Sequence, residues 1–456
     1  MIPPMSAPDS TLPSAGPDLP AQIGKYRVLR RLGEGATSDV FLAVDAFGGG
    51  EVAIKRLRSW ATSSRAGGDY GVRFFSAEAA LAGRLQHPNV VQILDAVPED
   101  DAPYLVMEYV PGVTLKNFCR SDRLLPLDQI VELGFKCAMA LGYVFRQGVI
   151  HRDVKPANLL GVLDDQGHVT DVKVSDFGSA LNLMSDQTQV HRVGSLAYMP
   201  PEQIEGGDVD NRADMYALGA VLYHLIAGRP PFDAPNQMAL MHQIYHQAPT
   251  SLVGQRGGVT AELDAVILRA LAKHPTERYA DWDDFGRALS ELVARQLVPL
   301  ARLHEVKDSE RFNMLRALEF FAEFGDVELW EVVRRARWRR YPEGHALYKK
   351  GQEGNTFHII AQGEVEVWRD AKLVAELGQG TSVGEMAYLS PNPALRRHST
   401  DIRVRGENCT TISFTPESLG GLSPECQHRF DRAFIQVLVR RLHSAHEALA
   451  HPRRIL

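Results

Sequence analysis

The chain has 456 residues, of which 45% are hydrophobic and 23% are charged, and its formal net charge is −6. This composition is ordinary for a globular protein, which excludes collagen-like, fully disordered and disulfide-scaffold proteins. At about 100–200 residues per domain, the length predicts roughly two to four domains. The 50 basic and 56 acidic residues are nearly balanced, so we expect no nucleic-acid partner for the chain as a whole.

The cysteines and the N-terminal segment indicate the cellular setting. The four cysteines have no metal-ligand spacing and are too few for a disulfide framework. Residues 1–22 are rich in Pro, Ser and Ala and carry no basic residue, which is unlike a secretory signal. The best apolar segment elsewhere, residues 217–228, is much shorter than the ~20 residues needed to cross a bilayer. We therefore expect a flexible N-terminal tail, a cytoplasmic location and no membrane partner.

Residues 23–295 form the first predicted domain, and its character changes along the chain. Apolar alternation predicts strands at residues 26–29, 39–44, 51–58, 91–95 and 104–108, and helical spacing predicts a helix over 74–86. Further on, helical patterns predominate, at residues 127–146, 213–227, 238–247, 261–273 and 283–292. A strand-rich lobe followed by a helix-rich lobe predicts an α+β fold with a cleft between the lobes.

A linker at residues 296–310 is expected to lead into a second domain at 311–450, followed by a tail at 451–456. An amphipathic pattern predicts a helix over residues 311–338. Short strands with glycine turns follow up to residue 414, which is typical of a small barrel or jelly roll. An apolar stripe predicts a closing helix over residues 429–450. Five arginines between positions 334 and 340 are interpreted as a solvated helix face, with nucleic-acid or acidic-surface docking as the alternative.

A glycine-rich turn around Gly33 and Gly35 lies between the first two predicted strands of the first domain, residues 26–29 and 39–44. Glycines allow backbone N–H groups to approach phosphate oxygens, although a purely structural turn is the alternative. Lys55 lies inside an apolar strand, where an unpaired ammonium group would be costly. The phosphates of a nucleotide and the carboxylate of Glu78 would supply the anions it needs; Glu78 could otherwise be a solvated residue of a helix face.

Two further segments carry groups suited to phosphate chemistry. The sequence His-Arg-Asp-Val-Lys-Pro-Ala-Asn at residues 151–158 brings a carboxylate, a lysine and an amide together on one loop. Asp-Phe-Gly at residues 176–178 follows an alternating strand, so Asp176 is expected to emerge at the end of that strand. These segments, with Pro-Pro-Glu at 200–202, Asp214 and Arg278 in the same order, resemble the protein kinase family, in particular its bacterial serine/threonine members.

The resemblance implies a bilobal kinase fold, with ATP and Mg²⁺ as cofactors, and a role for each matching residue. Lys55 would hold the α- and β-phosphates and would be aligned by Glu78. Asn158 and Asp176 would bind Mg²⁺. Asp153 would accept the proton of the substrate hydroxyl, while Lys155 would steady the transferred phosphate and favour serine/threonine specificity. The expected ATP-binding residues are Leu32, Gly33, Glu34, Gly35, Val40, Ala53, Lys55, Met107, Glu108, Val110 and Leu160. Pro200 and Val154 depart from the family pattern, where alanine and leucine are usual.

Regulation by phosphorylation is a further hypothesis. Arg152 precedes the catalytic aspartate, and an arginine at this position pairs with a phosphorylated activation-loop residue in many kinases. The loop spans residues 179–199, and Ser185 and Thr188 are the candidate phosphorylation sites, with no phosphorylation as the alternative. Ser195 is interpreted as a structural contact of the catalytic loop. We hypothesise that autophosphorylation of this loop raises the activity.

The glycine spacing from residue 311 to 450 resembles the cyclic nucleotide-binding domain, a β-roll flanked by helices. In that family a Gly-Glu at the start of a short helix binds the ribose, and Gly384, Glu385 and Met386 match this pattern. An arginine nine or ten residues later binds the cyclic phosphate. Alignment on the following strand places His398 there, and Arg397 or Arg396 could serve only if the connecting loop is longer than usual. Binding of cAMP or cGMP and a degenerate domain with solvated arginines remain alternatives.

The sequence thus predicts a serine/threonine protein kinase that transfers the γ-phosphate of ATP to protein hydroxyl groups under the control of a C-terminal sensor domain. One alternative makes the C-terminal domain a ligand-free docking or dimerisation module, which would favour a homodimer. Another is a scaffold protein in which catalysis is incidental. The residues do not identify the protein substrate.

Overall fold

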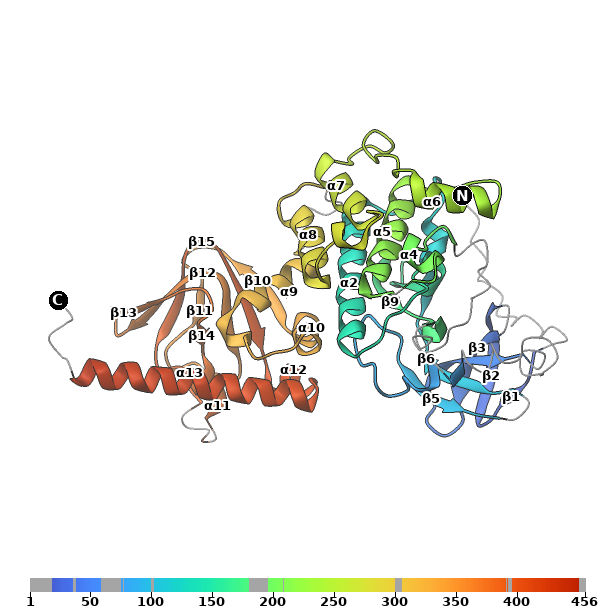
Figure 1. Cartoon of the computed structure of the whole chain (residues 1–456). Helices are drawn as coiled ribbons and strands as arrows, with labels where there is room; N and C mark the ends of the chain where they lie inside the picture. The colour runs from blue at the N-terminus through green and yellow to red at the C-terminus, as the bar shows by residue number, and fades with distance from the viewer. Residues whose placement is uncertain are drawn as a thin grey trace, which may run out of the picture. The chain divides into compact units, whose positions relative to one another are not determined.

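The computed structural model describes residues 19–35, 38–58, 75–76, 78–99, 102–179, 196–207, 209–299, 306–390, 392 and 396–450. The chain divides into two compact units, Met1–Gly286 and Arg287–Leu456, and Figure 1 shows the elements of each. Among the described residues, no helix is both long and apolar enough to span a membrane.

The N-terminal lobe of the first unit is a six-stranded antiparallel sheet in the order β1-β2-β3-β4-β6-β5. Its buried face is formed mainly by aromatic and β-branched residues, which pack well on a pleated sheet. The register places Val40 opposite Lys55 and Ala53 opposite Met107. The strands are β1 Gln22–Ile23, β2 Tyr26–Glu34, β3 Ser38–Asp45, β4 Glu51–Leu57, β5 Ile93–Val97 and β6 Tyr104–Glu108.

The helix expected over residues 74–86 is wrong in its extent. Among the described residues of that stretch, only 75, 76, 78 and 79 are helical, and turns follow up to residue 84. Gly83 has a φ of +72°, and the N–H of Arg84 bonds three residues back to the carbonyl of Leu81. A left-handed glycine commonly ends a helix, because it turns the chain away from the helix axis. Strand β5 also begins two residues later than expected.

The second lobe is mainly helical and contains a small sheet in the order β7-β8-β9. Helix α2 (Leu127–Arg146) has the bounds expected from the sequence, and it packs against α5 (Asn211–Ala227) in the core of the lobe. The catalytic-loop segment runs directly into η3 and β8, and β9 leads to η4. The other elements are β7 Gly112–Thr114, η2 Leu115–Phe118, η3 Pro156–Asn158, β8 Leu159–Leu163, β9 Val169–Val174, η4 Phe177–Ser179, α4 Pro201–Ile204, α6 Gln237–His246, α7 Ala261–Ala270, η6 Pro275–Glu277 and α8 Trp282–Ala294.

The second unit is a curled antiparallel sheet flanked by helices (Figure 1). Strand β15 lies between β10 and β12, β13 pairs with the other side of β12, β11 pairs with β15, and β14 with β12. Its elements are α9 Asp308–Ala317, η7 Glu319–Phe321, α10 Asp326–Arg335, β10 Arg337–Tyr341, β11 Ala346–Tyr348, β12 Phe357–Arg369, β13 Lys372–Leu377, β14 Ser382–Val383, α11 Glu385–Leu389, β15 Asp401–Phe414, α12 Pro416–Gly420 and α13 Pro424–Ala450.

The single helix expected over residues 311–338 is also wrong, because the structure has two helices there, α9 and α10, joined by η7. The turn between them lets Phe320, Phe321 and Phe324 pack on Phe430 of α13, with ring centroids 5.1–6.0 Å apart. The arginine cluster is correspondingly divided. Arg334 and Arg335 end α10, whereas the other three arginines lie exposed on strand β10.

Candidate active site

Lys55, Glu78 and Asp176 meet where the two lobes of the first unit come together. Lys55 Nζ donates hydrogen bonds to Glu78 Oε2 and Asp176 Oδ1, each at 2.7 Å. Lys55 lies on strand β4, Glu78 is a helical residue of the same lobe, and Asp176 follows β9 of the helical lobe. Asp176 has a φ of +66°, and Phe177 beside it packs on the His151 ring with centroids 4.7 Å apart. The three side chains therefore join both lobes at one point.

The pKa values of these three groups shift in different ways, according to burial and to the charges beside each group. Burial alone would lower the pKa of Lys55, but the two neighbouring carboxylates outweigh burial and raise it. The Lys55 ammonium holds the pKa of Asp176 far below its ordinary range. Glu78 is almost fully buried, and the loss of water raises its pKa to about 7 despite the lysine. Asp176 is therefore ionised at neutral pH, as a ligand for a divalent cation must be.

The catalytic-loop residues form a second cluster around Asp153. Lys155 Nζ donates to Asp153 Oδ2 at 2.5 Å, and Asn158 Nδ2 donates to the same oxygen at 3.1 Å and to the Asp153 carbonyl at 2.9 Å. Because the nitrogen of the Asn158 amide is used in these bonds, its oxygen remains for a cation. Two protein oxygens, from Asn158 and Asp176, suit Mg²⁺, which takes its other ligands from phosphate and water.

Arg152 is held in a strained backbone conformation beside this cluster. Its φ is +63°, a region that costs a non-glycine residue about 1–3 kcal/mol. Asp214 on α5 supports the turn, because its carboxylate accepts the backbone N–H groups of His151 at 2.7 Å and Arg152 at 2.8 Å. Burial lowers the pKa of Arg152, and its Nε is buried with no hydrogen-bond partner among the described residues. The structure thus presents an unsatisfied guanidinium nitrogen next to the catalytic loop.

The glycine-rich turn is tight at one glycine and open at the other. Gly35 N–H donates to the Ser38 carbonyl at 2.7 Å, and a Cβ on Gly35 would come within 2.9 Å of that oxygen. A Cβ on Gly33 would meet nothing within 4 Å, so there is room beside the strand for a phosphate group. The turn is therefore closed by its own hydrogen bond at Gly35 and open at Gly33.

The ends of the turn are fixed by Arg58, a residue that the sequence reasoning missed. Its Nε and Nη2 donate to the two carboxylate oxygens of Asp39 at 3.0 and 2.8 Å, and Nη2 also donates to Glu34 at 2.5 Å. The Arg58 guanidinium therefore connects the strands before and after the turn. The spacing of charges gave no signal for this pairing, since Glu34 and Arg58 lie 24 residues apart.

The other expected ATP-binding residues lie on the strands that border the cleft. The carboxylate of Glu108 binds Lys173 Nζ of β9 at 2.8 Å, and its backbone N–H donates to the Gln92 carbonyl at 2.9 Å, so neither group is open to an adenine. Lys173 was also missed by the sequence reasoning. Leu32, Gly33 and Glu34 lie on β2, Val40 on β3, Ala53 on β4, Met107 and Glu108 on β6, Leu160 on β8, and Gly35 and Val110 just beyond β2 and β6. Ser185, Thr188 and Ser195 lie outside the described residues.

In the second unit, Gly384 and Glu385 begin α11, and Glu385 is almost fully buried. A Cβ on Gly384, whose φ is +85°, would fall 2.4 Å from Tyr348 Oη, so only glycine fits there. Glu385 Oε1 accepts a hydrogen bond from Arg441 Nη1 on α13, and Glu385 Oε2 is buried without a partner among the described residues. Arg441 was not predicted, and no local signal could pair residues 56 positions apart. Met386 is 69% exposed.

The structure gives Arg397 and His398 contacts away from Glu385. Arg397 Nη1 donates to the Gly351 carbonyl at 2.8 Å. His398 is buried, and its ring stacks on Tyr348 with centroids 3.9 Å apart. A Cβ on Gly354 would lie 2.8 Å from the same imidazole. The expected ribose-binding carboxylate and the candidate phosphate-binding arginine are therefore not joined by any contact among the described residues.

Fold and site together define a bilobal kinase domain followed by a β-roll domain. A protein kinase domain family model matches residues 26–293, and a cyclic nucleotide-binding domain family model matches residues 338–422. The chain therefore belongs to the protein kinase family and carries a cyclic nucleotide-binding domain after the kinase domain.

Bacterial serine/threonine kinases are similar to the first of these domains. The serine/threonine-protein kinase PknB of Mycolicibacterium smegmatis is 36% identical over 310 residues, which cover 64% of this chain and 46% of that protein. PrkC of Bacillus subtilis is 36% identical over 264 residues, covering 57% and 39%. The crystal structure of the Mycobacterium tuberculosis PknI kinase domain has 30% identity and a TM-score of 0.45, covering 59% of this chain and 96% of that one. The chain spans less than half the length of these two curated relatives.

Proposed function

We propose that this chain is a serine/threonine protein kinase that transfers the γ-phosphate of ATP to hydroxyl groups of proteins. The contact of Lys55 with both Glu78 and Asp176 carries the proposal, because it sets a cation for the phosphates beside a carboxylate for the metal. The 36% sequence identity of this chain to two bacterial serine/threonine kinases supports serine and threonine hydroxyl groups as the acceptors of the phosphate. Domain boundaries at residues 23–295 and 311–450 remain part of the proposal, and both family matches lie within them.

Each residue of the site has one task in this reaction. ATP with Mg²⁺ would supply the phosphoryl group and the cation that neutralises it. Lys55 would bind the α- and β-phosphates, and Asn158 and Asp176 would hold the cation. Asp153 would accept the proton of the substrate hydroxyl while the hydroxyl oxygen bonds to the γ-phosphorus. Lys155 would neutralise the charge of the transferred group. ADP leaves with the bridging oxygen.

The C-terminal domain is proposed to control activity or targeting, with a cyclic nucleotide as the effector. The unpaired Glu385 oxygen supports this proposal, since a buried carboxylate oxygen can accept a ribose hydroxyl. We expect the rate of phosphorylation of a generic basic protein by the full-length chain to change severalfold on addition of cAMP or cGMP. The measurement is transfer of labelled γ-phosphate at matched ATP, with 5′-AMP as the control nucleotide. Equal rates under all conditions, with no heat of binding for either cyclic nucleotide, would contradict this control.

Autophosphorylation of the activation loop is part of the same proposal. The unsatisfied Nε of Arg152 supports it, because a phosphate would supply the missing acceptor. Mass spectrometry of the active chain is expected to find phosphate on Ser185 or Thr188, and treatment with a phosphatase should lower the activity. The Asp153→Asn variant incubated with ATP is the control and should remain unmodified. An active chain without phosphate between residues 179 and 199 would exclude the mechanism.

A specific observation favours a second role of the C-terminal domain, which we propose as dimerisation. Helix α13 exposes Ile435, Leu438, Val439 and Leu442, each between 42% and 60% exposed. Spacings of three, four and seven residues place them on one face, as in a coiled coil. Phe430 and Phe434 on the same helix are buried. The same stripe on a second copy of α13 would cover the first.

The dimer makes a direct prediction about molecular mass in solution. Replacing both Leu438 and Leu442 with glutamate should convert a dimer of the full-length chain to a monomer, because charges would be buried at the seam. Light scattering coupled to size exclusion measures the mass. Arg429→Glu adds the same side chain to α13 outside the stripe and should leave the dimer intact. A wild-type chain that is monomeric at tens of micromolar would refute the dimer.

A further inference from the structure

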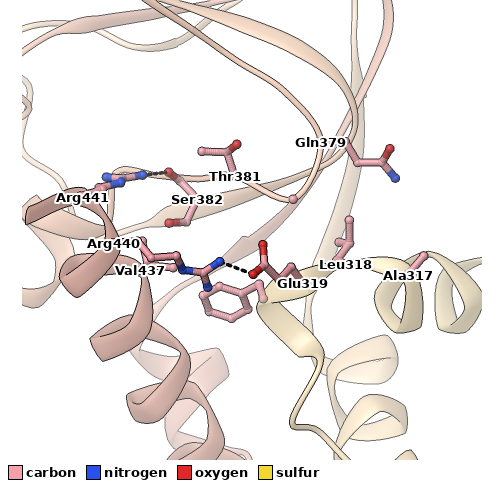
Figure 2. Close-up of a pocket in the computed structure, with 11 residues that line it drawn as sticks. Ala317, Leu318, Glu319, Gln379, Thr381, Ser382, Val437, Arg440 and Arg441 are labelled. Carbon is pink, nitrogen blue, oxygen red and sulfur yellow. Dashed lines mark hydrogen bonds and ion pairs between the residues drawn. The ribbon is translucent and has the colours of Figure 1, made fainter. Parts of the chain in front are cut away.

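A cavity of about 560 Å³ lies in the second unit, between the segment after α9, the loop before β14, and α13 (Figure 2). Its apolar lining includes Leu318, Phe320 and Val437, and two adjacent arginines, Arg440 and Arg441, line it from α13, the helix that also carries Val437. The volume lies within the roughly 300–1,000 Å³ typical of small-molecule sites. Gly384, Met386 and Arg397 do not line it. The cavity is therefore separate from the segment expected to bind a cyclic nucleotide.

Both arginines are held by carboxylates in different ways. Arg440 Nη1 donates to Glu319 Oε1, and the side chain of Glu319 is 76% exposed. An exposed pair of this kind contributes little to stability, so another anion can readily replace Glu319. Arg441 instead donates through Nη1 to the buried Glu385 and through Nη2 to the Ser382 carbonyl at 2.6 Å (Figure 2). Arg441 is thus fixed in the wall while Arg440 can exchange its partner.

A buried hydroxyl gives an independent indication of a missing ligand. Ser382 lines the cavity and is 1% exposed, yet its Oγ has no hydrogen-bond partner among the described residues. Leaving a buried polar group without a hydrogen-bond partner is unfavourable. An oxygen of a molecule in the cavity would satisfy this hydroxyl. The guanidinium groups of Arg440 and Arg441 can bind the other oxygens of such a molecule.

We propose that this cavity binds a small organic phosphate of nucleotide size. The phosphate displaces Glu319 from Arg440 and accepts hydrogen bonds from Arg440, from Arg441 and from Ser382 Oγ. Two guanidinium groups match the geometry of phosphate oxygens better than ammonium groups would. The flat or apolar part of the ligand packs on Leu318, Phe320 and Val437. Because Arg441 also holds Glu385, occupation of the cavity is linked to the position of α11.

Uridine 5′-monophosphate is a suitable probe, because it joins a phosphate to a flat base and lacks the adenine that the kinase cleft is expected to recognise. We expect isothermal titration of the full-length chain to show binding of this probe and none of uridine, which lacks the phosphate. Arg440→Gln should weaken binding by about tenfold or more, because it removes a charge-assisted hydrogen bond. Arg397→Gln, in the segment expected to bind a cyclic nucleotide, should leave it unchanged.

Two further variants separate the site from general charge and from misfolding. Arg432 lies on the same helix and pairs with Glu323 at 3.2 Å outside the cavity, so Arg432→Gln is the matched control and should bind as the wild type does. Ser382→Ala should weaken binding severalfold while the unfolding temperature stays equal or rises, because it deletes an unsatisfied hydroxyl. The proposal is overturned if the wild type does not bind uridine 5′-monophosphate, if Arg440→Gln binds it equally well, or if Arg432→Gln loses as much affinity as Arg440→Gln.

Discussion

Replacing Asp153 with asparagine is expected to slow phosphoryl transfer about 10²–10⁴-fold, the usual contribution of a positioned general base. Asparagine preserves the size of the side chain and can still accept the hydrogen bonds that Lys155 and Asn158 donate at 2.5 and 3.1 Å. It cannot accept a proton from the substrate hydroxyl. The loss should therefore fall on the rate of transfer from labelled ATP, while the affinity for ATP is almost unchanged.

A surface variant controls for effects of the substitution itself. Asp122 is exposed and its carboxylate pairs with Arg120 at 3.1 Å, so Asp122→Asn should retain full activity. If Asp153→Asn keeps more than a tenth of the wild-type rate, Asp153 is not the proton acceptor. If the variant also loses ATP affinity, the defect lies in the structure of the cleft instead.

The second large effect is expected at Arg278, whose side chain is completely buried in the helical lobe. Its guanidinium donates to both carboxylate oxygens of Glu202, at 2.6 and 2.9 Å, and it packs over the Tyr216 ring at 5.0 Å. The other donors bond backbone carbonyls of Arg212, Ala272 and Lys273 at 2.9–3.1 Å. Every nitrogen of the group is therefore used.

Arg278→Ala leaves the carboxylate of Glu202, whose side chain is 16% exposed, without its buried partner, and breaking a largely buried pair of this kind costs about 3–5 kcal/mol. For a unit of this size, that loss should lower the calorimetric unfolding temperature of the kinase unit by about 10 °C. Arg229→Ala is the matched control, because Arg229 is exposed and its guanidinium bonds Gln255 at 3.1 Å. A shift below 2 °C for Arg278→Ala would show that the Arg278–Glu202 pair does not stabilise the lobe. The double variant Glu202→Leu with Arg278→Met should recover part of the loss, because no buried charge remains unpaired.

The local pattern of apolar residues predicted those helices and strands whose signal lies within the element itself. Helix α2 has the expected bounds because apolar residues recur at helical spacing after a proline, and the two-lobe fold was confirmed. The helix expected over residues 311–338 failed for a physical reason. Apolar periodicity is the same for one helix and for two consecutive helices that pack on one core, and only the packing of Phe320 and Phe321 against α13 separates them.

The sequence by itself determined the chemistry of the kinase site, because Asp153, Lys155 and Asn158 lie on one loop. The charges of Lys55 and Asp176 also restrict their partners to an anion for the lysine and a cation for the aspartate. Tertiary structure alone decided which charges meet. Arg58 joins Glu34 and Asp39, Arg441 joins Glu385, and Asp214 supports the strained turn at Arg152. The residues of each of these contacts lie between 19 and 62 positions apart. The contacts of Glu385 and Asp214 form because packing buries a charge that must then be satisfied, and the spacing of residues along the chain carries no record of that requirement.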